Sequence, residues 1–293
     1  MNPFDTTVWT ACITPLTTNA AVVDYDSFEQ TLRRQEAAGN GILLLGTTGE
    51  GASLSSEEKR QIIRWATTLG LNVPVMVGVP GYQFADALYC VEWLRGTHAD
   101  ALLVPTPCYT KPGRHGQAAW FRSMLDAAGR PCMLYNVPSR SGVALATDAV
   151  RDIADHPNCW SIKEASGSID RFNEFAETGL AIYSGNDDIM PDIGPRGAAG
   201  LVSVASNLWP EQTLDYARRC IAGTLSVDER QLWAAAIAEL FRASNPVPAK
   251  RAMHALGLIA TPALRPPLHG DDLDDLSPLL SYSAEIQETT VAA

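Results

Sequence analysis

The 293-residue sequence contains few lysines. Only four of its 22 basic residues are of this type, and the other 18 are arginines. Any chemistry that needs a side-chain amine must therefore use one of four positions: Lys59, Lys111, Lys163 or Lys250. With so few lysines, each one can be assessed separately as a candidate for a reactive amine.

Paired cysteine motifs and long apolar segments are missing as well. None of the six cysteines forms a CxxC pair or has zinc-ligand spacing with a histidine, which predicts reduced thiols and no metal site. The first residues lack the basic region and apolar core of a signal peptide, and no run of about 18 apolar residues occurs. We therefore expect a cytoplasmic protein without a membrane partner.

Positive charge is also in short supply, because the formal net charge is −11. Nucleic acid is a poor partner for such a chain, since phosphate binding needs a basic face. Hydrophobic residues make up 46% of the sequence, which indicates a folded globular protein. The net charge says little about small anionic substrates, because a binding site has its own local field.

Eight short, nearly continuous apolar runs are typical of strands buried on both faces of a parallel sheet. Between them lie helical patterns, such as the segment after Ser55, where Glu58 completes a capping box and Gly70 follows the apolar stripe. This alternation predicts an α/β fold, specifically a (β/α)8 TIM barrel, with a doubly wound open sheet as the alternative. The runs are centred near Thr10, Leu44, Met76, Leu103, Tyr135, Ile162, Tyr183 and Ser203.

The last part of the chain has helical patterns and no strand-like run. The segments LWAAAIAELFRA and PVPAKRAMHALG carry these patterns. We therefore divide the chain into a barrel domain, residues 1–222, and a C-terminal helical domain, residues 223–293.

Lys163 is the most informative of the four lysines. It ends an apolar strand, where burying an ammonium group is costly. A desolvated amine has a lowered pKa and is nucleophilic towards ketones, with which it forms a Schiff base. The alternative is a strand-end lysine that reaches solvent or pairs with Glu164. By contrast, Lys250 has the pattern of an ordinary lysine near the start of a late helix.

Other polar residues follow the ends of neighbouring strands, where TIM barrels place their active sites. Tyr135 could relay protons, or it could be a buried tyrosine with a satisfied hydroxyl. Thr47 and Thr48 could grip a carboxylate, or cap the next helix. Arg140 could hold a carboxylate bidentately, or lie on the surface.

Five segments together resemble one family. GTTGE, YNVPSRSG, IKEASG, SGND and GLVSVASN occur in the order and spacing of the dihydrodipicolinate synthase / N-acetylneuraminate lyase family of class I aldolases. The resemblance covers nearly the whole chain. It implies a TIM barrel with a C-terminal helical domain, and an aldolase that binds pyruvate as a lysine Schiff base without a metal or organic cofactor.

The resemblance also implies catalytic residues. Lys163 matches the Schiff-base lysine, and Tyr135 matches the tyrosine that relays protons over the imine. Thr47 matches the first threonine of GTTGE. In the dihydrodipicolinate synthases of the family, this threonine links the tyrosine to a second tyrosine lent by the neighbouring subunit. Tyr109 is the matching residue, so the resemblance implies a homo-oligomer, either a dimer or a tetramer.

Four further positions are implied as substrate-binding. Thr48 matches a ligand of the pyruvate carboxylate. Arg140 matches the arginine that binds the carboxylate of aspartate semialdehyde. Gly185 and Val202 match positions whose backbone carbonyls lie near the site.

The resemblance leaves three interpretations of the function open. The first is condensation of pyruvate with aspartate 4-semialdehyde, in the synthesis of lysine and diaminopimelate. The second is another pyruvate aldolase, such as a lyase of N-acetylneuraminate or a 2-keto-3-deoxy sugar acid. The third is a catalytically silent barrel that only binds ligands.

The sequence departs from the resemblance around the pocket where lysine inhibits some members. The matching positions here are Ser56, Lys59, Tyr82, Asp86 and Cys108. Lys59 would repel the ammonium group of lysine, and Cys108 lacks the phenol found in other members. We therefore expect lysine to inhibit weakly or not at all.

Overall fold

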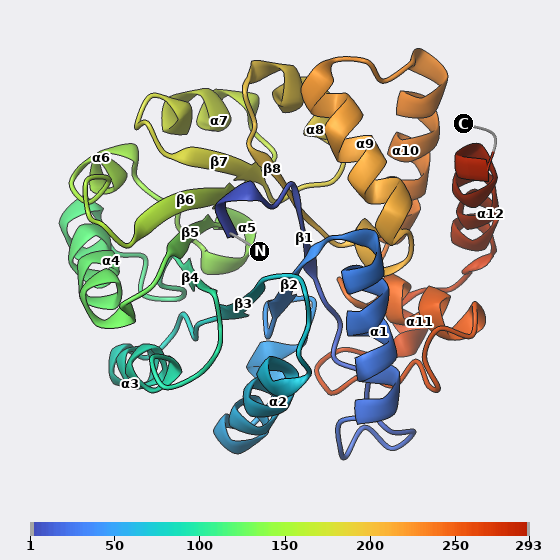
Figure 1. Cartoon of the computed structure of the whole chain (residues 1–293), viewed down its shortest axis with the longest axis horizontal. Helices are drawn as coiled ribbons and strands as arrows, with labels where there is room; N and C mark the ends of the chain where they lie inside the picture. The colour runs from blue at the N-terminus through green and yellow to red at the C-terminus, as the bar shows by residue number, and fades with distance from the viewer. Residues whose placement is uncertain (1–2, 292–293) are drawn as a thin grey trace.

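The computed structural model describes residues 3–291 and contains a closed barrel of parallel strands (Figure 1). The strands pair in chain order, and β8 closes the ring against β1 through register pairs such as Thr10↔Ser203. The (β/α)8 prediction is confirmed, and the open-sheet alternative is wrong. The strands are β1 Val8–Ala11, β2 Gly41–Leu44, β3 Val75–Gly78, β4 Ala101–Pro105, β5 Cys132–Asn136, β6 Cys159–Glu164, β7 Ala181–Ser184 and β8 Gly200–Ser203.

Helices surround the barrel and follow the strands around it (Figure 1). The α-helices are α1 Tyr25–Ala38, α2 Ser56–Thr68, α3 Phe84–Leu94, α4 Arg114–Ala128, α5 Pro138–Ser141, α6 Thr147–Arg151, α7 Ile169–Ala176, α8 Met190–Ile193, α9 Pro210–Ala222, α10 Val227–Leu240, α11 Val247–Ala255 and α12 Ser277–Val291. Short 3-10 helices cover Pro3–Asp5, Gly51–Ser53, Gly194–Arg196, Ala205–Asn207 and Gly270–Asp272.

The capping box predicted before α2 is present. Ser55 Oγ accepts from the backbone N–H of Glu58 at 3.2 Å, and Glu58 Oε2 accepts from the N–H of Ser55 at 2.9 Å. These two bonds satisfy donors that the first turn of a helix leaves free. Gly70 follows the helix with φ +64°, a left-handed conformation that glycine adopts without steric cost.

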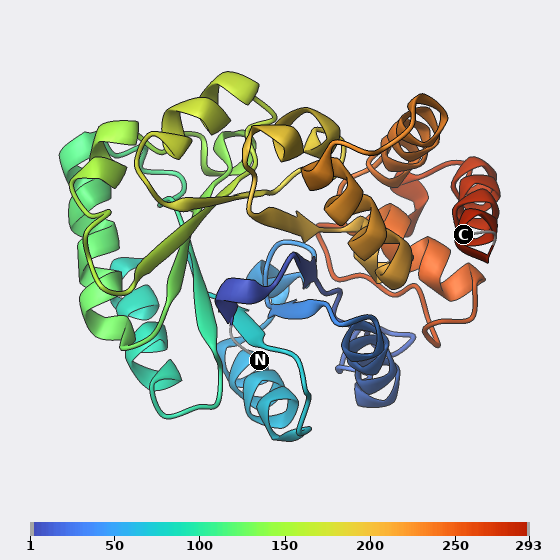
Figure 2. The same ribbon diagram turned by 45° about the horizontal axis from the view of Figure 1, so that its top comes forward.

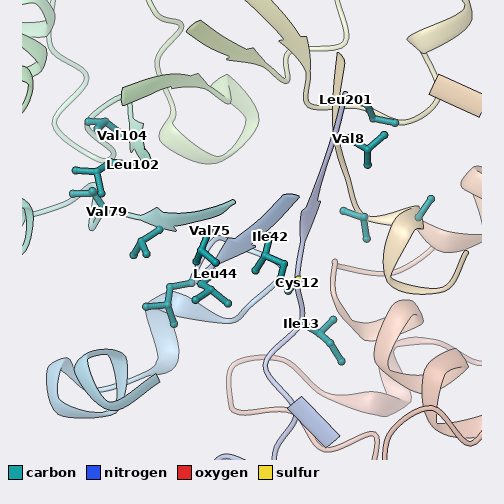
Figure 3. Packing of buried hydrophobic residues seen from close by; sticks show 14 of the residues in the cluster. Val8, Cys12, Ile13, Ile42, Leu44, Val75, Val79, Leu102, Val104 and Leu201 are labelled. Atoms are coloured by element: carbon teal, nitrogen blue, oxygen red, sulfur yellow. The ribbon is translucent and has the colours of Figure 1, made fainter. Parts of the chain in front are cut away.

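Both faces of the strands are buried, which explains why the strand runs are almost continuously apolar. Side chains such as Met76 and Met133 fill the barrel interior. Alternate residues face the helices, and Figure 3 shows Ile42, Leu44 and Val75 from two neighbouring strands close together in this outer layer. The barrel is thus a packed core, and its chemistry is confined to the strand ends.

The chain after α9 forms a helical region beside the barrel, next to α1 and α9 in both views (Figures 1 and 2). A hydrogen bond of 2.8 Å from Trp209 Nε1 to Ser283 Oγ joins this region to the barrel. The boundary between residues 222 and 223 stays a prediction. In the part of the chain that the structure describes, no helix has the length and apolarity to span a bilayer.

Candidate active site

Lys163 and Tyr135 lie side by side at the carboxyl ends of two adjacent strands. They are register partners across β5 and β6, so the alternation of strands directs both side chains to the same face of the sheet. Lys163 Nζ lies 4.5 Å from the centre of the Tyr135 ring. Two side chains that are 28 residues apart in the sequence therefore lie next to each other in the fold.

Burial controls the charge of Lys163. The residue is 7% exposed, and burial lowers the pKa of its amine from 10.5 to about 8. The Asp187 carboxylate opposes this shift, and the Arg140 guanidinium adds to it. About a tenth of such amines are uncharged one pH unit below the pKa, against a negligible fraction of ordinary lysines. Lys163 therefore has nucleophilic character near neutral pH.

The Tyr135 phenol is protonated in the free protein. Burial raises its pKa to about 12, and the Glu164 charge acts in the same direction. The Arg140 charge and a hydrogen bond from Thr47 oppose the rise. Tyr135 therefore has a proton to donate next to the Lys163 amine. The relay role of Thr47 stays a prediction.

Thr47 and Thr48 lie in a tight turn that follows β2. The turn is closed by the N–H of Glu50, which donates to Thr47 O at 3.0 Å. Gly51 is required there, since a Cβ at this position would come within 2.2 Å of the Leu45 carbonyl oxygen. Thr48 is buried, and its Oγ1 accepts from Asn245 Nδ2 at 2.9 Å.

Gly185 packs directly against the catalytic candidate on β6. A Cβ on Gly185 would lie 2.8 Å from Lys163 Cε, closer than carbon atoms tolerate. Its N–H donates to Glu164 O at 2.6 Å, which fixes the backbone beside the lysine. Val202 is fully buried in the barrel interior, in the same cluster as Tyr135. The roles of the Gly185 and Val202 carbonyls stay predictions.

Arg140 and Tyr109 lie at the mouth of the barrel. Arg140 belongs to α5 and is exposed, and its charge acts on both Lys163 and Tyr135. Tyr109 is 78% exposed and points its ring at Tyr82, with 6.0 Å between the ring centres. Its N–H donates to Ser141 O at 3.2 Å, next to Arg140. The backbone of Tyr109 therefore contacts α5. Its ring packs against Tyr82 and not against Lys163 or Tyr135.

Asp187 lies close enough to Lys163 for its charge to act on the amine, although the sequence analysis assigned it no role. It is 1% exposed, and burial raises the pKa of its carboxyl group to about 6. It accepts from the Ser203 hydroxyl and, at 3.1 Å, from the N–H of Val204. Asp187 thus joins the ends of β7 and β8 and places a negative charge near Lys163. Its place in SGND, directly after a strand, is the only signal in the sequence.

A second buried network braces the two strands from the helix-facing side. Asn136 and Glu164 are register partners, each one residue after Tyr135 or Lys163. Asn136 Nδ2 donates to Glu164 Oε2 at 2.6 Å, and the N–H of Ser166 donates to Oε1, also at 2.6 Å. This brace fixes the separation of the two catalytic candidates. The period of two along a strand is the signal that could have identified it.

The expectation for Lys250 is wrong. Instead of an ordinary helix-start lysine, Lys250 is fully buried and pairs with Glu50, and its Nζ also donates to Ala263 O at 2.8 Å. The helical region folds back over the turn after β2, and this brings the two charges together across 200 positions of the sequence. Glu50 also accepts from the N–H of Arg265 at 2.9 Å.

Within residues 3–291, no group of three or more histidine, cysteine or acidic side chains lies close enough together to hold a metal ion. The chemistry available at the strand ends is that of an amine, a phenol and hydroxyl groups. Such a set fits attack on a carbonyl carbon followed by proton transfer at the neighbouring atoms.

Comparison with known proteins agrees with the geometry. A model of the dihydrodipicolinate synthetase family matches residues 5–280. A 4-hydroxy-tetrahydrodipicolinate synthase of Francisella philomiragia is 43% identical over 283 residues, 96% of each chain. The solved 4-hydroxy-tetrahydrodipicolinate synthase of Methylacidiphilum fumariolicum has a TM-score of 0.90 at 30% identity, covering 98% of each chain. A solved structure described as the first monomeric dihydrodipicolinate synthase variant has a TM-score of 0.88 at 28% identity, covering 96% of this chain and 97% of its own. The chain therefore belongs to the dihydrodipicolinate synthetase family.

Proposed function

We propose that the protein condenses pyruvate with L-aspartate 4-semialdehyde to form 4-hydroxy-tetrahydrodipicolinate, a step of lysine and diaminopimelate synthesis. The observation that carries the proposal is the buried Lys163 amine, whose pKa is lowered to about 8, 4.5 Å from the Tyr135 ring. The names of the relatives in Francisella and Methylacidiphilum support this choice of reaction.

The first stage is formation of the Schiff base. The neutral Lys163 amine attacks the ketone carbon of pyruvate, and the ketone oxygen leaves as water. One proton of that water comes from the amine and the other from the Tyr135 phenol. The products are an iminium ion on Lys163 and a phenolate on Tyr135, which is ready to act as a base.

The second stage makes the carbon–carbon bond. The iminium nitrogen acidifies the methyl group, so the Tyr135 phenolate removes a proton and leaves a neutral enamine. The enamine carbon then attacks the aldehyde carbon of the semialdehyde, while Tyr135 returns its proton to the aldehyde oxygen. An iminium ion on Lys163 is formed again.

Ring closure releases the enzyme. The amino group of the bound semialdehyde attacks the iminium carbon, and the bond from that carbon to Lys163 breaks. Of the two protons lost by the attacking nitrogen, one returns to Lys163 and the other to the Tyr135 phenolate. In these steps every proton passes between Lys163, Tyr135 and the substrates, so the proposed reaction uses no metal or organic cofactor.

Substrate binding is assigned to residues around this pair. Thr48 binds the pyruvate carboxylate, and Arg140 binds the carboxylate of the semialdehyde, with the backbone carbonyls of Gly185 and Val202 lining the site. Arg140 suits this role because its charge reaches both Lys163 and Tyr135. A bidentate contact between guanidinium and carboxylate fixes the orientation of the second substrate.

The proposed active form is a cytoplasmic homo-oligomer, a dimer or a tetramer. Tyr109 supports it, since a phenol that is 78% exposed at the mouth of the barrel is available to a neighbouring subunit. In this arrangement Tyr109 completes the proton relay of the neighbouring site through Thr47. One solved relative is described as a monomeric variant, and sedimentation distinguishes such a monomer from the proposed dimer or tetramer.

Regulation by lysine is expected to be weak or absent. Ser56, Lys59 and Asp86 line a cavity of about 140 Å³ between α2 and α3. The pKa of Lys59 is lowered by burial, and its charge in that cavity disfavours a second ammonium group. An inhibition constant for lysine well below the millimolar range would contradict this expectation.

A product assay tests the proposed reaction directly. The purified protein is incubated with pyruvate and aspartate 4-semialdehyde, and separately with N-acetylneuraminate and with a 2-keto-3-deoxy sugar acid. The proposal predicts that the semialdehyde reaction has the highest kcat/KM. Equal or faster cleavage of either sugar acid would assign the protein to the lyase interpretation instead.

A further inference from the structure

We propose that Asn245, a residue of the C-terminal helical region, is a positioning residue that orients the Thr48 hydroxyl towards the carboxylate of pyruvate. The inference rests on the proposed function, because it assumes that Thr48 binds that carboxylate. If the inference is correct, the C-terminal helical region contributes a residue to the active site, whereas Lys163 and Tyr135 both come from the barrel.

Asn245 forms a buried hydrogen bond with the Thr48 hydroxyl, and Asn245 is the donor. Asn245 Nδ2 donates to Thr48 Oγ1 at 2.9 Å, and both side chains are buried, with exposures of 8% and 3%. Within residues 3–291 this is the only hydrogen bond that the Thr48 side chain makes. Because Oγ1 is the acceptor, the hydroxyl proton remains for a different acceptor.

The position of Thr48 identifies that acceptor by its chemistry. Thr48 directly follows Thr47, whose side chain is near enough to lower the pKa of the Tyr135 phenol, so the turn lies beside the site where we propose that the ketone reacts. The Thr48 hydroxyl still has a proton to donate. A carboxylate oxygen of a 2-oxo acid bound next to it would accept that proton in a hydrogen bond. Hydrogen bonds to an ionised acceptor are about twice as strong as neutral ones.

The helical region is held firmly enough for this role. Lys250 pairs with Glu50 two residues after Thr48, and Glu50 also accepts from the N–H of Arg265. Both contacts join the helical region to the turn that contains Thr48. The amide of Asn245 is therefore fixed relative to Thr48 by buried bonds on the same turn, and it loses little entropy in orienting the hydroxyl.

Removing the amide tests the inference through pyruvate binding. The assay measures the pyruvate concentration that half-saturates Schiff-base trapping with borohydride. We expect Asn245→Ala to raise this concentration about tenfold while the maximal yield is kept, a change equivalent to about 1.4 kcal/mol. Asn245→Asp, which has the same shape, cannot donate to Thr48 and should raise it further.

A double-mutant cycle separates orientation from general damage. Thr48→Val removes the hydroxyl, so adding Asn245→Ala in that background should change the half-saturating concentration no further. Ser283→Ala is the matched control. It removes the bond to Trp209 that joins the same region to the barrel elsewhere, so it should lower stability without affecting pyruvate.

Three results would overturn the inference. The first is an unchanged half-saturating concentration in Asn245→Asp, which is the variant to use if Asn245→Ala does not fold. The second is an equal further loss from Asn245→Ala in the Thr48→Val background. The third is an equal loss from Ser283→Ala. Failure of the unaltered protein to form any adduct would instead reject the proposed function, and the inference with it.

Discussion

The pKa of the Lys163 amine depends on its burial and on two charged neighbours, Asp187 and Arg140. Burial lowers the pKa to about 8, Asp187 raises it and Arg140 lowers it. The two charged residues therefore act on one amine in opposite directions. An amine attacks a ketone only when it is uncharged, so the rate of Schiff-base formation rises as the pH increases through this pKa.

The first prediction concerns the pH profile of Schiff-base formation. Asp187→Asn removes the charge that favours the ammonium form, so the midpoint of the profile should move below pH 8. Arg140→Gln removes a repelling charge, so the midpoint should move up. The measurement is the rate of borohydride trapping with saturating pyruvate between pH 6 and pH 10. Shifts of both variants in the same direction would show that the two charges do not control the amine.

The second prediction concerns the buried pair of Lys250 and Glu50. Removing one partner leaves an uncompensated buried charge, so Lys250→Met should lower the free energy of unfolding by about 3–5 kcal/mol. Adding Glu50→Gln to Lys250→Met removes the remaining charge and should restore part of the loss. Urea denaturation followed by circular dichroism gives the values. A double variant less stable than Lys250→Met would mean that hydrogen bonding, and not charge pairing, dominates at this site.

The carboxyl ends of β5, β6 and β7 carry Tyr135, Lys163 and Gly185, the residues around which we propose that the reaction takes place. Register pairs place Tyr135 beside Lys163, and the close approach of Gly185 fills the next position around the barrel. The spacing leaves no room for a larger residue after β7. The small size of Gly185 is therefore needed to accommodate the Lys163 side chain.

The third prediction follows from that spacing. In Gly185→Ala the added Cβ would lie 2.6 Å from Ala165 Cβ and 2.8 Å from Lys163 Cε, so the end of β6, including the lysine side chain, must shift. We expect at least a tenfold loss in the rate of Schiff-base formation, because small displacements in a reacting geometry are costly. Gly270→Ala is the control, since its Cβ meets nothing within 4 Å. Equal rates for both variants would show that Lys163 tolerates the displacement.

Elements with a periodic pattern could be predicted, whereas contacts across the fold could not. The eight strands and the capped helix after Ser55 follow from local patterns of apolar and capping residues. Lys163 stood out because a lysine in an apolar strand violates the pattern. Asn245 and Lys250 carry no such local signal, because their partners lie about 200 residues away and depend on how the helical region packs.

At the scale of the whole molecule, the barrel and the helical region act on one site. The barrel positions Lys163 and Tyr135, while the helical region contacts the turn of Thr48 through Asn245. Tyr109 is exposed, and we propose that its phenol serves the site of a neighbouring subunit. The proposed assembly would therefore complete each active site with a residue that the chain itself keeps exposed.

The fourth prediction is that two inactive variants restore activity when mixed. Lys163→Met lacks the amine, and Tyr109→Phe lacks the phenol donated to its neighbour. A hybrid dimer contains one site with both groups, so random exchange should return roughly a quarter of full activity. Sedimentation should show a dimer or tetramer. Hybrids without activity, or a fully active monomer, would contradict the shared site.

The central claim is that pyruvate forms a Schiff base with Lys163 and with no other lysine. Borohydride reduction in the presence of pyruvate, followed by peptide mass spectrometry, tests it most directly. We expect a 1-carboxyethyl group on Lys163 alone, and none in the Lys163→Met variant. Absence of the adduct, or an adduct on Lys59, Lys111 or Lys250, would contradict it.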